Sequence, residues 1–199
     1  MCRRNKIDKL FKEYNCEDEL LVYDGVVTEG EYTILFILKE SNISNSTKQQ
    51  GFDDNFWFKN VYKAKKDGKY FGENLNRLEK SAQTKYYNCI TQIAQEIANK
   101  ENVKFSEIGI SYININKNGG SSICNNVGIA KWLTENSCEK EFLLKQIKII
   151  KPQKIVIFSC NKSNLLIENF ADEMKNKYNY NVVKKSYHPS RYKKQSQTL

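Results

Sequence analysis

Mainly apolar residues form three runs along the chain, each bounded by polar residues. The runs are 32–38 (YTILFIL), 108–115 (IGISYINI) and 155–158 (IVIF). Continuous runs of this length, rich in Ile, Val and aromatic residues, are typical of strands that a sheet buries on both faces. A shorter segment at 180–183 predicts a fourth strand close to the C-terminus.

Between these runs, apolar residues recur at helical spacing. Four of them predict an amphipathic opening helix within residues 3–23, namely Ile7, Leu10, Phe11 and Tyr14. The pairs Asp24-Gly25 and Glu29-Gly30 then indicate turns. Further helices are expected between 73 and about 97, from 127 to 149 with a break near 136–137, and after 163. The alternation predicts an α/β fold, a three-layer α/β/α sandwich whose central, mostly parallel sheet has four strands.

The length and composition fit one domain. The 199 residues are 40% hydrophobic and show no repeat or linker, so we expect a single domain over 1–199, with its opening helix at about 3–23 and its core at about 32–192. No apolar run reaches the roughly 18 residues of a membrane helix, and the N-terminus lacks an apolar signal region. We therefore expect a cytoplasmic monomer that does not contact a membrane.

Charge and cysteine content limit the kinds of partner, metal and cofactor that we expect. The formal charge of +9 suggests a polyanionic partner such as DNA, although Lys-rich composition alone is a weak signal. The six cysteines are scattered, none forms a Cys-x-x-Cys pair, and a single histidine cannot complete the usual zinc patterns. We expect reduced, mostly buried thiols, no metal and no cofactor.

Polar residues follow two of the predicted strands. Glu40, Ser41 and Asn42 come directly after the first run, and Asn114 lies near the end of the second. Open α/β sheets place their ligand sites beyond the carboxyl ends of such strands. An ordinary solvated loop is the alternative for the first group, and local hydrogen bonding is the alternative for Asn114.

The only histidine lies in a short loop near the C-terminus, in the sequence SYHPSR at 186–191. Pro189 restricts the residue before it to extended conformations, so His188 is expected at a strand end or in a turn. A neutral imidazole is well suited to proton transfer or hydrogen-bond donation near neutral pH. The alternative is a solvated histidine in the tail.

Five short motifs occur in an order that one family shares. They are KESN at 39–42 after the first strand, GKYFG at 68–72, YININK at 112–117, IIKP at 149–152 leading into the third strand, and HPS at 188–190. On these motifs, from about Ile34 to Arg191, the chain resembles the uracil-DNA glycosylase superfamily. The first motif is closest to the family's GEAP form but lacks its proline and glycine, and has Ser41 and Asn42 in their place. The branch with the most similar motifs carries an iron–sulfur cluster on four cysteines. Only one of the four has a counterpart in this chain, Cys138, so no cluster is expected here.

The resemblance implies a monofunctional DNA glycosylase that hydrolyses the N-glycosidic bond of a flipped-out base. Glu40 would position water and stabilise the cationic sugar, and His188 would donate a hydrogen bond to the departing base. Asn114 would read the base edge, Phe71 or Tyr70 would stack on the base, and Ser41 and Asn42 would shape the pocket. The implied DNA contacts are Lys117, Asn118, Gly119, Gly120, Ser121, Ser190, Arg191 and Tyr192. The altered first motif means that the resemblance does not imply uracil itself; a uracil-like or modified cytosine base is expected, in repair or in defence against phage with modified DNA.

Other readings remain open from the sequence. A non-catalytic DNA-binding or damage-sensing protein could keep the same fold. A Schiff-base lyase step would use Lys39 or Lys117, and a Cys-His hydrolase would use Cys160 or Cys124. Retention of both Glu40 and His188 favours the glycosylase.

Overall fold

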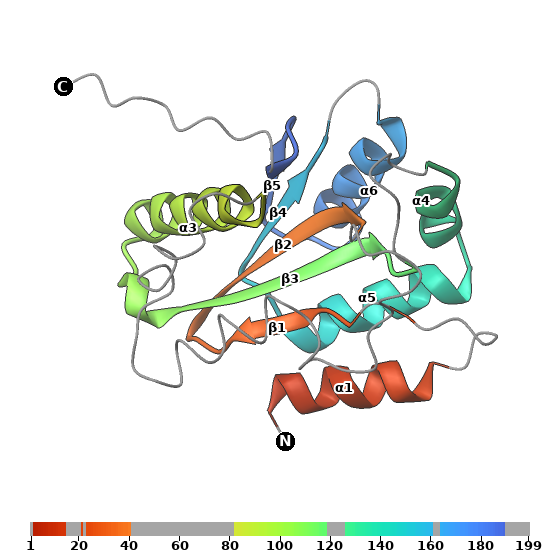
Figure 1. Ribbon diagram of the computed structural model, residues 1–199, viewed down its shortest axis with the longest axis horizontal. Coiled ribbons are helices and arrows are strands. Elements are labelled where there is room, and N and C mark those ends of the chain that lie inside the picture. Colours follow the sequence, from red (N-terminus) through yellow and green to blue (C-terminus); the bar gives the residue numbers. More distant parts are fainter. Residues whose placement is uncertain are drawn as a thin grey trace.

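The computed structural model describes residues 2–14, 21, 23–40, 82–118, 126–160 and 164–189. Within these residues, an α/β fold is built around one sheet of five strands (Figure 1). The strands are β1 (Gly25–Thr28), β2 (Tyr32–Glu40), β3 (Ile108–Asn116), β4 (Lys154–Phe158) and β5 (Val182–Lys185). Their order across the sheet is β1-β3-β2-β4-β5. β1 runs antiparallel to β3, and the other neighbouring pairs are parallel.

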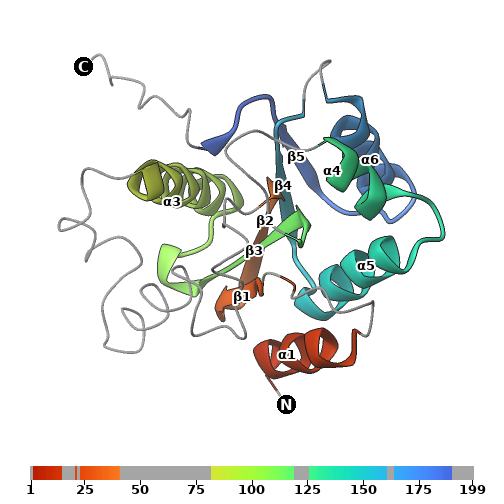
Figure 2. The same ribbon diagram turned by 45° about the vertical axis from the view of Figure 1, so that its right-hand side comes forward.

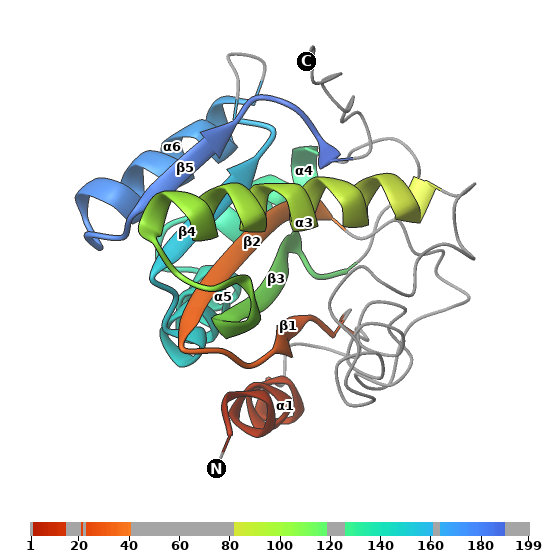
Figure 3. The same ribbon diagram turned by 90° about the vertical axis from the view of Figure 1, so that its left-hand side faces the viewer.

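Helices cover both faces of this sheet. α3 (Ala82–Glu101) lies on one face, and the other face carries α4 (Asn126–Leu133), α5 (Cys138–Ile150) and α6 (Leu165–Asn176) (Figures 2 and 3). α1 (Arg3–Glu13) packs beside α5 and β1, and a short 3-10 helix, η5 (Phe105–Glu107), precedes β3. The predicted layering of helices around a mostly parallel sheet is therefore present.

The predicted number of strands was wrong, because β1 was interpreted as a stretch between two turns. Gly25 does not form a turn but begins β1, opposite Tyr112 of β3. The strand has only four residues, and turn-forming pairs flank it on both sides. Its hydrogen bonds come from pairing with β3, more than eighty residues later in the chain. The local sequence therefore does not indicate that this segment is a strand.

Several element boundaries also differ from the prediction. The opening helix ends at Glu13 rather than extending to residue 23. The last strand is Val182–Lys185 rather than 180–183, because the backbone N–H of Tyr180 still bonds to Met174 at the end of α6. The predicted break near 136–137 is confirmed: Ser137 caps α5 by accepting a hydrogen bond from the backbone N–H of Lys140.

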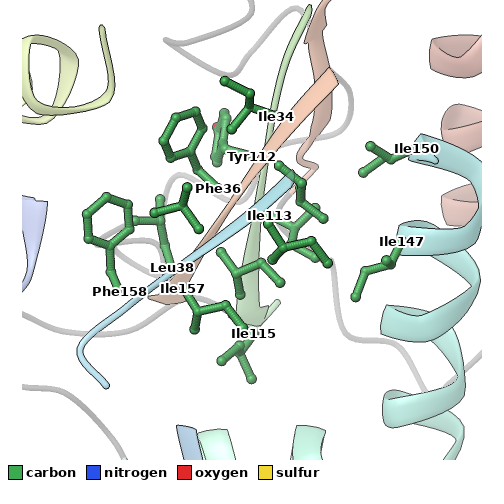
Figure 4. Close-up of a cluster of buried hydrophobic side chains, with 14 of the residues drawn as sticks. Ile34, Phe36, Leu38, Tyr112, Ile113, Ile115, Ile147, Ile150, Ile157 and Phe158 are labelled. Atoms are coloured by element: carbon green, nitrogen blue, oxygen red, sulfur yellow. The ribbon is translucent and has the colours of Figure 1, made fainter. Parts of the chain in front are cut away.

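The central strands form the buried core of the fold. Every side chain from Ile34 to Leu38 in β2 is at most 5% exposed, so this strand is buried on both faces as predicted. On one face Ile113 of β3 faces Ile147 of α5, and on the other Phe36 lies near Phe158, with ring centroids 6.3 Å apart (Figure 4). Full burial of each such side chain contributes about 1.5–3 kcal/mol. The strand ends that follow are therefore held by a well-packed core.

Candidate functional site

The carboxyl ends of the four parallel strands lie along one edge of the sheet. Glu40 at the end of β2 is in register with Asn116 at the end of β3, and Phe158 at the end of β4 is in register with Lys185 of β5. The chain passes from β2 to β3 on one side, then returns past β2 to β4 on the other. In open α/β sheets, ligand sites occur beyond the carboxyl ends of the strands that flank such a reversal, here β2 and β4.

The backbone at the end of β4 has an unusual conformation at this point. Ser159, which is buried, has a φ of 64°, in the left-handed region that non-glycine residues adopt infrequently. Its backbone N–H donates to the carbonyl of Tyr187 at 3.1 Å, and that of Cys160 donates to the carbonyl of Lys185 at 3.0 Å. These bonds hold the segment after β5 against the end of β4.

The segment that carries His188 is thereby fixed at the edge of the sheet. The ring of Tyr187 lies 6.0 Å from that of Phe158, and the Tyr187 side chain hydrogen-bonds to the thiol of Cys89 in α3. His188 itself is half-buried and Pro189 is buried. His188 therefore extends from an anchored strand end, and it does not lie in a solvated tail.

The end of β3 is organised around a buried carboxylate that the sequence did not single out. Asp24 is fully buried, and its Oδ2 accepts hydrogen bonds from the backbone N–H of Asn114 at 2.6 Å and from Asn114 Nδ2 at 3.2 Å. Its Oδ1 accepts from Lys117 Nζ at 2.6 Å and from Gln146 Nε2 at 2.8 Å. The side chain of Asn114 is thus hydrogen-bonded within the protein, but to a residue 90 positions earlier in the chain rather than to a local group.

Lys117 does not occupy a position from which it can contact DNA. Its side chain is fully buried and forms an ion pair with Asp24, and the Phe11 ring lies 6.0 Å from its ammonium. Burial lowers the pKa of the Lys117 ammonium to about 8, and the Asp24 carboxylate partly opposes this change. The predicted DNA contact of Lys117 is therefore wrong. A lysine that follows a strand is usually exposed, whereas this one is buried with its partner Asp24.

The residues just after β3 are fixed by short-range contacts. The backbone N–H of Asn118 donates to Asn116 Oδ1 at 3.1 Å. Gly128 of α4 packs so closely on Asn116 that a Cβ on this glycine would lie 2.6 Å from Asn116 Nδ2. Asn118 is half-buried, and it is the one predicted DNA contact besides Lys117 that falls among the described residues.

Lys39 connects β2 to the start of α6. Its Nζ donates to Oδ1 of Asn164, the residue before α6, at 2.9 Å. This contact crosses the region between the ends of β2 and β4. The amine therefore has a polar partner. This hydrogen bond gives Lys39 a structural role that does not depend on a Schiff-base lyase step.

The Cys-His hydrolase alternative is disfavoured by the environment of Cys160. The thiol of Cys160 is buried, and burial raises its pKa to about 12, which disfavours the thiolate that such a hydrolase needs. Near the histidine loop, Lys184 forms ion pairs with Glu168 and Asp172 of α6 at 2.6 and 2.8 Å. Hydrogen bonds to both carboxylates raise the pKa of Lys184.

The remaining predicted site residues fall outside the described residues. For Glu40 the structure describes the backbone at the end of β2. Outside the described residues lie Ser41, Asn42, Tyr70, Phe71, Gly119, Gly120, Ser121, Ser190, Arg191 and Tyr192. Of the predicted site, the structure therefore brings Glu40, Asn114 and His188 to the same edge of the sheet. The sequence reasoning missed Asp24 and Gln146, because Asp24 precedes a glycine and was interpreted as part of a turn.

Comparison with protein-family models, with curated proteins and with solved structures finds no significant match to this chain. In the part of the chain that the structure describes, no helix is long and apolar enough to cross a membrane. In the same residues, no cluster of three or more His, Cys, Asp and Glu side chains could hold a metal ion.

Proposed function

We propose that the chain is a monofunctional DNA glycosylase acting on a deaminated or otherwise modified base. One observation carries the proposal: the three residues to which the sequence motifs give chemical roles, Glu40, Asn114 and His188, belong to segments that end at the same edge of the sheet. They come from three different parts of the chain. Parallel strands and the anchored segment after β5 are what bring them to that edge.

The chemistry of base release suits this set of residues. Cleavage of the N-glycosidic bond leaves a cation-like sugar and a base that takes up negative charge. Glu40 would position the attacking water and stabilise the sugar, and His188 would donate a hydrogen bond to the leaving base. Asn114, with donor and acceptor groups on one side chain, would read the polar edge of the base. In this proposal, the well-packed strands below the site fix these groups before the base arrives.

The proposal is tested with duplex and single-stranded DNA that carries uracil, 5-hydroxymethyluracil, hypoxanthine, xanthine, 5-hydroxymethylcytosine or its glucosylated form. Abasic sites are scored by alkaline cleavage. We expect release of at least one base by the wild type, and a loss of at least a hundredfold in rate for Glu40→Gln and for His188→Ala, typical of a lost acid–base or electrostatic group. DNA affinity should stay within a few-fold of wild type in both variants.

The same measurement separates the glycosylase from a non-catalytic DNA-binding protein. A protein that binds these DNAs but releases no base in any context would be a binding or sensing protein that shares the fold. A protein that releases a base equally well after both substitutions would still be a glycosylase, but with other catalytic residues.

A further inference from the structure

Asp24 controls how the side chain of Asn114 is oriented. The amide of an asparagine can turn by half a rotation, which exchanges its oxygen and its nitrogen. A carboxylate only accepts hydrogen bonds, so the nitrogen side of the Asn114 amide must face Asp24 Oδ2, 3.2 Å away. The opposite orientation would place two acceptors against each other at a residue that is fully buried.

The carboxylate cannot readily adapt to the other orientation. Its second oxygen accepts hydrogen bonds from Lys117 and Gln146, and Oδ2 also accepts from the backbone N–H of Asn114. Rotation of Asp24 would disrupt these bonds in the interior, where unmade hydrogen bonds are costly. The chain thus holds the Asn114 amide in one of its two orientations.

One side of the amide remains for a ligand. Among the residues that the structure describes, none donates a hydrogen bond to Asn114 Oδ1, and Asp24 is the only recorded acceptor for Nδ2, which has two N–H groups. Asn114 is 3% exposed, so a ligand that hydrogen-bonds to it would do so where little water competes for the same groups. There a mismatched hydrogen bond costs the most.

We propose that Asp24 is a positioning residue that fixes which side of the Asn114 amide presents the hydrogen-bond donor and which presents the acceptor. The site then accepts only bases whose polar edge carries the complementary order of acceptor and donor. This role rests on the proposed glycosylase function and specifies its substrate class. Uracil carries an acceptor at position 4 and a donor at position 3, and cytosine carries the reverse. Hypoxanthine and adenine differ in the same way at positions 6 and 1. An amide free to turn could read either member of each pair; the amide held by Asp24 reads one.

The test compares kcat/KM within matched pairs of bases in DNA: uracil with cytosine, 5-hydroxymethyluracil with 5-hydroxymethylcytosine, and hypoxanthine with adenine. For a base that is bound but not released, the ratio of dissociation constants in the Glu40→Gln background replaces the ratio of kcat/KM. In Asp24→Asn, residue 24 offers both a donor and an acceptor, so either orientation of Asn114 finds a partner. We expect the preference within the pairs to fall on the order of tenfold to a hundredfold, the discrimination of a good two-bond contact to a base edge.

Gln146→Met is the matched control. It removes a different hydrogen bond to the same carboxylate and leaves Asn114 its partner. Its preference within each pair should stay within about twofold of wild type, even if the variant is less stable. An equal loss of preference in Gln146→Met and Asp24→Asn would indicate general loosening of the site and would overturn the role of Asp24.

A second measurement does not depend on activity. We expect the side-chain amide protons of Asn114, assigned by comparison with Asn114→Asp, to exchange slowly with solvent in the wild type. In Asp24→Asn they should exchange at least tenfold faster. Fast exchange in the wild type, or a base preference that Asp24→Asn leaves unchanged, would overturn the positioning role while the glycosylase stands. A wild type that releases no base overturns the proposed function and, with it, this role.

Discussion

The ammonium of Lys117 lies 2.6 Å from the carboxylate of Asp24, and both side chains are completely buried. A pair of this kind is costly to desolvate, yet removal of one partner is worse because it leaves the other charge alone in the interior. The pair joins the segment before β1 to the turn after β3, at the end of the sheet where the candidate site lies. It is therefore expected to matter for stability as well as for the orientation of Asn114.

Replacement of Lys117 by methionine should lower the free energy of unfolding by about 3–5 kcal/mol, because Asp24 would keep its charge without a cationic partner. The double variant Asp24→Asn/Lys117→Met, which has neither charge, should recover at least half of that loss. Urea unfolding of the wild type, of Lys117→Met, of Asp24→Asn and of the double variant measures both effects. Simple addition of the two single losses in the double variant would show that the two charges are not coupled.

The pair should also give stability a particular pH dependence. Burial lowers the pKa of Lys117 to about 8, below its value in the unfolded chain, so the folded protein releases this proton first as the pH rises. Between about pH 8 and pH 10 the unfolded chain binds more protons at this site, and this contribution to stability therefore increases with pH. Below pH 8 both states hold the proton and the full cost of the buried ammonium is present.

The measurement is the difference in unfolding free energy between wild type and Lys117→Met at several pH values. We expect the wild type to gain about 1 kcal/mol on the variant between pH 8.5 and 9.5, since a full proton difference corresponds to about 1.4 kcal/mol per pH unit. A difference that stays constant or changes in the opposite direction over this range would show that the pKa of the ammonium is not lowered in the folded protein.

The central strands were predictable from sequence because their burial on both faces leaves continuous apolar runs, as in Ile34–Leu38. It was also predictable that the segments with Glu40, Asn114 and His188 end at the same edge of the sheet, since parallel strands share the edge at which they end. β1 was missed because four residues between two turn signals carry too little pattern of their own. Its place depends on pairing with β3.

The network around Asp24 could not be derived in the same way. Asp24 bonds with Lys117 and Gln146, which lie 93 and 122 residues further along the chain. An acidic residue before a glycine is normally a turn signal, and a lysine after a strand is normally exposed. Both expectations concern local sequence, whereas burial of the pair results from the packing of α1, α5 and β1 around it. Only the three-dimensional arrangement shows that each charge has a partner.

Thiol reactivity should follow burial. Burial raises the pKa values of Cys89 and Cys160 to about 12, whereas Cys2 and Cys138 are exposed. At pH 8 we expect iodoacetamide to alkylate the two exposed thiols at least a hundredfold faster than the two buried ones in the native protein, as followed by peptide mass spectrometry. Rates should become equal in urea. Rapid native alkylation of Cys160 together with loss of activity would instead support a thiol nucleophile.

Gly128 should be a position where a methyl group destabilises the protein although it lies in a helix. In an exposed helix, glycine to alanine stabilises by about 1 kcal/mol. Here a Cβ would lie 2.6 Å from Asn116 Nδ2, so the side chain that ends β3 would have to move. We expect Gly128→Ala to lower the free energy of unfolding by about 1–3 kcal/mol, the usual cost of overpacking. Val127→Ala, one residue earlier in α4 and 78% exposed in the native protein, is the control and should change stability by less than about 0.5 kcal/mol. A gain in stability for Gly128→Ala would mean that α4 does not pack against Asn116 as described.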